Sequence, residues 1–240
     1  MRRGLLFLIF VCTAFCCRAQ HLADRDVLEQ WRAGAEVSAE SVAAYGTDRC
    51  FTHSAIDETL FGRMKGKSYK DDCTVPLVEL RYIKVLHFDL EGRIRLGEMV
   101  CNRKIAEDLV EIFRTLFDAG YPIERMVLVD EYDADDEASM EANNSSSFNF
   151  RRIAGSTRIS RHGLGMAVDI NPLYNPYVKG EGPSMIVSPR SGKRYADRSG
   201  DFPCKIDESD LCCREFLRHG FEWGGAWKSL KDYQHFEKAD

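Results

Sequence analysis

LVELRYIKVLHFD, residues 77–89, is the stretch that decides the fold, because it is rich in the β-branched and aromatic residues that favour strands. Glu91-Gly92 follows and suits a tight turn into a second apolar stretch over residues 93–100. This pattern predicts a β-hairpin on which the neighbouring segments can pack.

Downstream of the hairpin, the periodicity changes from that of a strand to that of a helix. Asn102 is a candidate N-cap, Gly120 is a candidate C-terminal glycine, and apolar residues recur at helical spacing between them. We therefore predict an amphipathic helix over residues 102–119 that packs on the sheet.

The rest of the chain alternates shorter elements. We predict strands over residues 126–130 and 166–171, separated by a long acidic and serine-rich surface loop over residues 130–147. A helix is predicted over residues 207–219, and an aromatic closing segment over residues 221–235. Because a hairpin precedes helices and strands in this mixed order, the predicted fold class is α+β, an antiparallel sheet with helices packed on it.

The sequence divides into three regions. Residues 1–19 begin with two arginines, continue with an uncharged stretch and end in Cys-Arg-Ala, which is typical of a signal peptide that is removed. Its apolar core covers only ~21 Å as a helix, short of the ~30 Å of a bilayer, so we expect no stable membrane span. Residues 20–75 are predicted as an N-terminal helical and irregular layer, and residues 76–240 as the main domain.

The charge of the chain limits its partners. The 240 residues carry a net charge of −5, and removal of residues 1–19 takes away three arginines and no acidic residue, which leaves −8. Proteins that bind nucleic acids cluster Lys and Arg along the phosphates, so we expect no nucleic-acid partner. We expect an exported monomer, periplasmic or extracellular.

Six of the nine cysteines lie beyond residue 19, namely Cys50, Cys73, Cys101, Cys204, Cys212 and Cys213. Six cysteines in an exported protein permit up to three disulfides, but the sequence selects no pairing, and free buried thiols are the alternative. Their spacing includes no C-x2-C zinc pattern, so we predict no cysteine metal site.

Two short stretches hold the residue types of a hydrolytic metal site. In SRHGLGMAVD, residues 160–169, a small-residue turn that enters a strand separates an imidazole from a carboxylate, so both can face one point. In DYQH, residues 232–235, a second carboxylate and a second imidazole stand three apart. Two histidines and one carboxylate are a known zinc set that leaves a position for water, and a further acid can act as the base.

These stretches, S-x-H-x-x-G-x-A-x-D followed by D-x-x-H, resemble the signature of the zinc D-alanyl-D-alanine carboxypeptidases and L-alanyl-D-glutamate peptidases. The similarity extends over residues 77–237 and includes GEMVCN, YPIERM, NNSSSFNFR, DINPLYNPYV and FEWGGAWKSLKDYQHFE. This family acts on bacterial cell-wall peptides and shares its fold with the hedgehog signalling domain. The resemblance therefore implies a hedgehog/D-Ala-D-Ala peptidase-like fold.

Matched position by position, the resemblance implies that Zn2+ is bound by His162, Asp169 and His235. It implies that Asp232 is the catalytic acid and base. It also places on Arg151 the arginine that contacts the substrate carbonyl.

Several further residues have two interpretations. The segment around Arg151 departs from the family pattern, because Phe150 replaces a frequent cysteine and Arg152 a frequent proline. Ser160 either positions a ligand or the substrate, or caps the turn. Trp223 and Trp227 either line the substrate groove or stabilise the core.

The resemblance implies a zinc metallopeptidase, either a carboxypeptidase or an endopeptidase, that hydrolyses amide bonds in the stem peptides of peptidoglycan. One alternative is a non-catalytic, zinc-stabilised, secreted binding or signalling module, and a further one is a disulfide-linked structural protein. The sequence leaves open which bond is cut, how the cysteines pair, the oligomeric state, and whether the protein is periplasmic, released or lipid-anchored.

Overall fold

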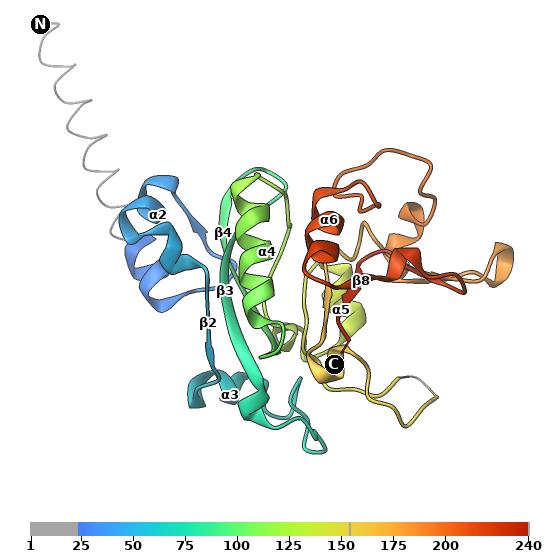
Figure 1. The fold of residues 1–240 in the computed structure, drawn as a ribbon, viewed down its shortest axis with the longest axis horizontal. Helices are drawn as coiled ribbons and strands as arrows, with labels where there is room; N and C mark the ends of the chain where they lie inside the picture. The colour runs from blue at the N-terminus through green and yellow to red at the C-terminus, as the bar shows by residue number, and fades with distance from the viewer. Residues whose placement is uncertain (1–23, 154, 240) are drawn as a thin grey trace, which may run out of the picture.

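The computed structural model describes residues 24–153 and 155–239, and the predicted signal peptide over residues 1–19 lies outside them. The described chain combines helices with three antiparallel sheets, as expected for the α+β class (Figure 1). None of the helices it contains has both the length and the apolar character that a bilayer crossing requires.

The largest sheet has the strand order β1-β4-β3-β2. Its centre is the predicted hairpin, formed by β3 (Leu80–Phe88) and β4 (Ile94–Asn102), which pair along their whole length. Gly92 in the connecting turn has a φ of 74°, a left-handed conformation that glycine adopts without steric cost. The hairpin prediction is confirmed.

The segment before the hairpin supplies both edges of this sheet. β1 (Glu36–Val37) pairs with β4, and β2 (Thr52–Ala55) pairs with β3. The sequence predicts no strands here, because β1 and β2 are very short and all four residues of β2 are exposed, so neither strand shows an apolar pattern. The same segment contains helical residues 24–30, α2 (Ala39–Tyr45) and α3 (Glu58–Met64).

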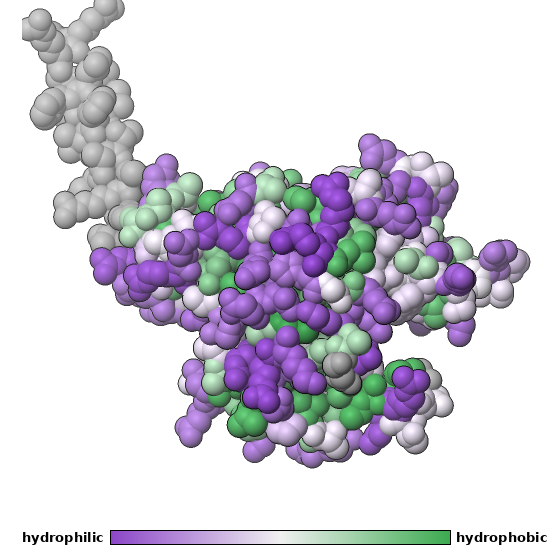
Figure 2. All heavy atoms as spheres, in the orientation of Figure 1, coloured by the Kyte–Doolittle hydropathy of each residue, from purple (hydrophilic) through white to green (hydrophobic). Residues whose placement is uncertain are grey.

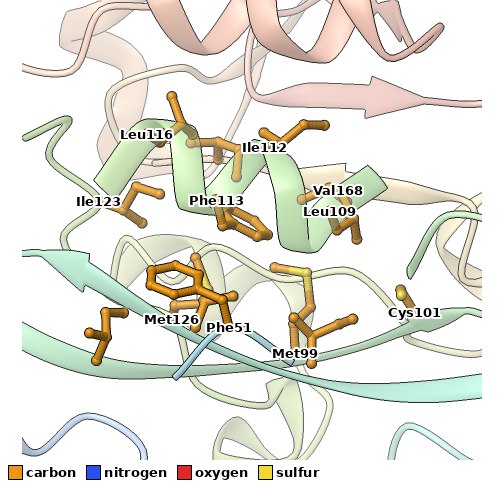
Figure 3. Packing of buried hydrophobic residues seen from close by; sticks show 14 of the residues in the cluster. Phe51, Met99, Cys101, Leu109, Ile112, Phe113, Leu116, Ile123, Met126 and Val168 are labelled. Carbon is orange, nitrogen blue, oxygen red and sulfur yellow. The ribbon is translucent and has the colours of Figure 1, made fainter. Parts of the chain in front are cut away.

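Helix α4 (Ala106–Asp118) forms the centre of the core (Figure 3). Figure 3 shows Phe113 on the side of α4 that faces the strands, toward Met99, and Ile112 and Leu116 on the opposite side. These side chains are all less than 2% exposed. The predicted amphipathic helix is therefore present, and apolar residues on two of its sides are buried.

The start of α4 differs from the prediction. Asn102 is not its N-cap, because Asn102 ends β4 and Ile105 holds the N-cap position. The Asn102 side chain accepts a hydrogen bond from the backbone N–H of Lys104 (3.1 Å) and donates one to the carbonyl of Leu164 (3.1 Å). An asparagine at the end of a strand thus shapes the turn before the helix.

Helix α6 (Leu211–Arg218) lies on the side of α4 away from the large sheet. It begins later than the prediction, which placed its start at residue 207. Asp210 caps α6 by accepting hydrogen bonds from two backbone N–H groups of its first turn. Phe216 of α6 meets the ring of Phe113 edge-on, with centroids 6.4 Å apart, and stacks on Phe236 at 4.2 Å. This packing joins the large sheet to the C-terminal half.

Two three-stranded sheets form the C-terminal half. One has the order β5-β10-β8 and the other β7-β6-β9. Their strands are β5 (Ala167–Asp169), β6 (Tyr177–Lys179), β7 (Ile186–Ser188), β8 (Glu222–Trp223), β9 (Lys231–Asp232) and β10 (His235–Glu237). The strand predicted over residues 166–171 is confirmed in a shorter form.

The predicted surface loop over residues 130–147 and the strand over 126–130 are wrong. The first contains α5 (Asp136–Glu141), and its later asparagines and serines are buried. Asn144 is 1% exposed, and its amide bonds both the N–H (2.9 Å) and the carbonyl (3.0 Å) of Val127. The Asn144 side chain therefore makes the hydrogen bonds that a neighbouring strand would make. The polar residues of this segment bond buried backbone groups instead of facing solvent.

Short segments of 3-10 helix connect these elements. They are η1 (Thr47–Cys50), η2 (Leu77–Glu79), η3 (Val129–Tyr132), η4 (His162–Leu164), η5 (Gly182–Ser184), η6 (Arg190–Tyr195) and η7 (Gly224–Ala226). The six described cysteines are free thiols, four of them buried. This matches the alternative of unpaired thiols.

The surface shown in Figure 2 is mainly hydrophilic, with small hydrophobic patches scattered over it. Large exposed apolar side chains are few among the described residues, namely Val78, Ile153, Ile186 and Leu217.

His87 on β3 is a buried histidine that belongs to the fold. Its side chain is 2% exposed, and its Nδ1 lies 2.6 Å from the carbonyl oxygen of Ile123. Burial lowers the pKa of His87 to about 4, although the bond to Ile123 acts in the opposite direction. The folded protein therefore holds His87 neutral at pH values where the unfolded chain protonates it.

We predict that His87→Gln flattens the pH dependence of stability between about pH 6.5 and pH 4. Since the unfolded state alone takes up the proton in this window, the wild-type free energy of unfolding falls with falling pH by on the order of 3 kcal/mol on account of this residue. Urea unfolding at several pH values measures this loss. Val85→Ala on the same strand is the control, because it lowers stability by a similar amount at every pH; parallel curves for wild type and His87→Gln would contradict the prediction.

Candidate metal centre

Two strands and the turn before one of them bring three potential metal ligands together. Asp169 ends β5 and lies directly opposite His235, the first residue of β10, in antiparallel register. Opposed residues of an antiparallel pair project from the same face of the sheet, so these two side chains are neighbours.

His162 reaches the same point from η4, the turn that precedes β5. Gly165 ends this turn with a φ of 68°, and a Cβ at this position would lie 2.7 Å from the backbone nitrogen of Asn102. Only glycine combines this backbone conformation with so close an approach. The turn therefore doubles back against the large sheet and points His162 toward β5.

The three ligand atoms lie close to one another. His162 Nε2 is 3.1 Å from His235 Nδ1 and 3.3 Å from Asp169 Oδ1, and His235 Nδ1 is 3.1 Å from the same Asp169 oxygen. Both imidazoles are 6% exposed. The structure thus brings together His162, Asp169 and His235 as a group that can hold a metal ion.

Each imidazole also has a partner on its outer nitrogen. Nδ1 of His162 lies 2.8 Å from the carbonyl oxygen of Ser147, and Nε2 of His235 lies 3.0 Å from a carboxylate oxygen of Glu237. Since these oxygens only accept, the outer nitrogens carry the protons, and in neutral rings the two inner nitrogens face each other with lone pairs. Such an arrangement needs a cation or a proton between the rings, so the donor set fits a metal ion.

The charges of this group are strongly coupled. Burial alone would raise the pKa of Asp169, but the charges and hydrogen bonds of His162 and His235 outweigh it and hold the pKa well below the usual range. Burial likewise opposes protonation of His235, yet Asp169 and Glu237 raise the pKa of this histidine to about 10. The site therefore strongly favours positive charge beside a permanently ionised Asp169.

Asp232 lies beside this group on β9, outside the three-ligand set. Its backbone pairs with Tyr177 of β6, and its Oδ1 is buried and has no hydrogen-bond partner among the described residues. Burial raises the pKa of Asp232 to about 7, while the neighbouring His235 acts in the opposite direction. A buried carboxyl oxygen without a partner is suited to receive a proton from a molecule that enters the site.

Gly224 allows Asp232 and His235 to sit together. A Cβ on Gly224 would lie 2.7 Å from the backbone oxygen of Asp232, 2.8 Å from its Cβ and 3.3 Å from the Cβ of His235. Because Gly224 has no side chain, η7 can pack closely against both Asp232 and His235.

Arg151 and Ser160 form a separate polar cluster. The Arg151 guanidinium pairs with Asp136 and donates a hydrogen bond to Ser160 Oγ at 3.0 Å. Ser160 is buried, and its hydroxyl also accepts from the N–H of Gly163 at 2.9 Å, which is the turn-capping arrangement. The backbone of Arg151 packs against Gly163, next to His162, so this cluster supports the turn that carries the ligand.

The two tryptophans differ in position. Trp223 is buried, donates a hydrogen bond from Nε1 to the carbonyl of Tyr233 at 2.9 Å, and lies over Gly225, as a core residue does. Trp227 is half-buried, and its ring centroid lies 5.3 Å from that of His235. Of the two, Trp227 is placed to contact a ligand at the site.

The sequence analysis did not single out Glu237 or the carbonyl of Ser147. Glu237 could have been found, because it stands two residues after His235 and alternate strand residues share a face. The Ser147 carbonyl could not, since a backbone acceptor leaves no trace in residue type.

Comparison with known proteins supports this grouping. Residues 154–238 match the family model described as D-alanyl-D-alanine carboxypeptidase, and this segment contains His162, Asp169, Asp232 and His235. No curated protein and no solved structure is similar enough to the chain to count as a match. The resemblance inferred from the sequence is confirmed over the matched residues. The family match supports the prediction that the protein is a peptidase.

We predict that Glu237→Ala weakens metal binding by about 10- to 100-fold, the usual effect of removing a carboxylate that orients a histidine ligand. Titration of the metal-free protein with Zn2+ measures this change. Glu237→Gln keeps an acceptor oxygen and should lose less. Equal affinities for wild type and Glu237→Ala would show that Glu237 does not orient His235.

We also predict that Gly224→Ala reduces metal affinity, because its Cβ displaces Asp232 and His235 from their present positions. Gly200→Ala is the matched control, since a Cβ there meets no atom within 4 Å. Both variants are compared by Zn2+ titration and by thermal unfolding of the metal-free protein. The prediction fails if the two alanine variants bind Zn2+ alike.

Proposed function

We propose that this protein, whose residues 154–238 match the D-alanyl-D-alanine carboxypeptidase family, is a zinc-dependent peptidase that hydrolyses amide bonds in the stem peptides of bacterial peptidoglycan. The observation that carries the proposal is the convergence of His162, Asp169 and His235 on one point, with the partnerless carboxyl oxygen of Asp232 beside it. The family match over residues 154–238 supports the peptide substrate.

The donor set supports zinc as the metal. Zinc in catalytic sites takes two histidines and one carboxylate, with ligand atoms about 2.0–2.2 Å from the ion. Ligands at that distance in a tetrahedron are separated by about 3.3–3.6 Å, slightly more than the 3.1–3.3 Å between the atoms of His162, Asp169 and His235. The group therefore has nearly the spacing of a zinc site before any ion is added.

In the proposed mechanism, Asp232 moves the proton. Bound zinc would supply a Lewis acid that lowers the pKa of water toward ~7 and polarises the scissile carbonyl. Asp232 accepts a proton at its partnerless Oδ1 from the attacking water and passes it to the leaving amine, as a general base that becomes the general acid. Without a metal, burial raises the pKa of Asp232 to about 7. The positive charge of bound zinc would lower this pKa and favour the ionised carboxylate, the form that accepts a proton from water.

The other residues of the site hold this arrangement. The Ser147 carbonyl and Glu237 fix the ring orientation of the histidines, and Trp227 borders the open side. From the family resemblance, we propose that Arg151 offers a fixed positive charge to the developing oxyanion. Its pairing with Asp136 and Ser160 keeps the guanidinium in one orientation.

We further propose that the protein is exported. The signal-peptide pattern of residues 1–19 supports this proposal, as does a substrate that lies outside the bacterial cytoplasm.

We predict that the purified protein binds about one Zn2+ per chain and releases amino acids or peptides from peptidoglycan, as a three-ligand site open to water should. His162→Ala should lose both the metal and the hydrolysis, because it removes a ligand. Asp232→Asn should keep the metal and lose at least ~100-fold in rate, the usual contribution of a general base. Metal analysis and mass spectrometry of the products, with and without chelator, measure both quantities and identify the bond that is cut.

Asp201→Asn, an exposed aspartate outside the site, is the control and should retain full activity. Metal binding without release of any peptide would contradict the proposed hydrolysis and favour a zinc-stabilised binding module. Loss of the metal in Asp232→Asn would make Asp232 a ligand instead of the base.

A further inference from the structure

A groove of about 640 Å³ lies next to the metal centre. Two of its lining residues also touch the centre. Trp227 packs beside the ring of His235, and Glu237 accepts the hydrogen bond from the same imidazole. A peptide that reaches the metal centre can therefore extend into this groove.

One projecting hairpin supplies five of the ten residues that line the groove. Residues 151–153 run out from the body and residues 155–160 return to it, and Figure 1 shows these two stretches in yellow at the lower right. Arg152 forms a bridge with Ile159, and the N–H of Ile153 donates to the carbonyl of Arg158 at 2.9 Å. This pairing brings together arginines that are six residues apart in the sequence.

The groove has an excess of positive charge. Three of its lining residues are arginines, Arg152, Arg158 and Arg161, whereas Glu237 is its one acidic residue. The Glu237 carboxylate is engaged by His235 at 3.0 Å and lies 3.8 Å from Arg161 Nε. The whole chain has a net charge of −5, so the positive charge of this groove is opposite in sign to that of the protein.

Two of these arginines have unused capacity for an anion. Arg152 donates to a neutral backbone carbonyl, that of Thr157, at 2.7 Å. The Arg158 side chain is exposed and makes no ion pair with any residue that the structure describes. Guanidinium groups bind carboxylates in a fixed two-pronged geometry, which suits recognition of an acidic group.

We propose that this groove binds a carboxylate of the peptide substrate through Arg152 and Arg158, so that the enzyme prefers acidic peptides over amidated ones. This inference rests on the proposed peptidase function, because it concerns the same open site. Beside the arginines, Ile153 and Ile159 offer apolar contacts to the short aliphatic side chains of such a peptide. Arg161, whose contacts already include Glu237, adds positive potential.

The test uses three synthetic stem pentapeptides, L-Ala-γ-D-Glu-L-Lys-D-Ala-D-Ala and two forms of it. One form has a carboxamide at the D-glutamyl carboxylate, and the other has a carboxamide at the C-terminus. The zinc-loaded wild type and Arg158→Gln are compared for KM and kcat, and binding is measured with Asp232→Asn so that hydrolysis is not needed. Arg158→Lys keeps the charge, and Arg190→Gln is an exposed control far from the groove residues in sequence.

We expect Asp232→Asn to bind the unmodified peptide about fivefold or more tightly than one of the two amidated forms, the size of a partly exposed ion pair, and the wild type to show the same preference in KM. The amidated form that binds weakly identifies the recognised carboxylate. Arg158→Gln should remove most of this preference through KM, with kcat little changed, and Arg158→Lys should restore part of it. Raising the salt concentration should reduce the preference in the wild type.

Equal binding of all three peptides, or no binding of any, overturns the inference. Hydrolysis of all three with equal KM leaves the proposed peptidase function intact while the groove assignment fails. Conversely, charge-dependent binding without hydrolysis supports the groove assignment while the peptidase function fails.

Discussion

The central constraint of this structure is that two imidazole nitrogens and a carboxylate oxygen are held about 3 Å apart in a nearly water-free place. When the imidazoles are neutral, each of these atoms is an electron-pair donor toward the others, so bringing them together is unfavourable unless a proton or a metal cation lies between them. Several parts of the fold act against that repulsion. The register of β5 and β10 places Asp169 opposite His235, and the Ser147 carbonyl and Glu237 hold the outer ring nitrogens.

The rest of the molecule supports these few contacts. Packing of α4 between the large sheet and α6 gives the core, and the stacked rings of Phe216 and Phe236 tie β10 to that core. Phe236 is the residue after His235, so the ligand is attached to one of the most buried positions in the protein. The buried amide of Asn144 and its neighbours fix the segment that ends in Ser147. Rigid placement of this kind is what a catalytic constellation requires.

The sequence predicts those parts of the fold whose side chains repeat. The hairpin of β3 and β4 and the body of α4 were predictable because long runs of buried residues show a clear period. The start of α4 was not, since Asn102 has the side chain of an N-cap but uses it in the turn after a strand. The segment over residues 130–147 was misjudged for a related reason: asparagine and serine indicate solvent in most chains, whereas here they bond buried backbone.

The candidate site was predictable as a set of residue types and not as a geometry. The motif pointed to His162, Asp169, Asp232 and His235, and the structure adds why they meet: a glycine turn, a strand register and the small volume at Gly224. The groove arginines follow from no motif, because their proximity depends on how one hairpin folds back. Tertiary contacts of this kind become visible only when the chain is traced in space.

X-ray absorption at the zinc edge of the zinc-loaded protein reports which atoms bind the ion. If His162, Asp169 and His235 are the ligands, zinc has nitrogen and oxygen neighbours about 2.0–2.1 Å away, with the outer-shell signal of two imidazoles. A sulfur neighbour at about 2.3 Å would instead assign the metal to the cysteines and rule out this ligand set.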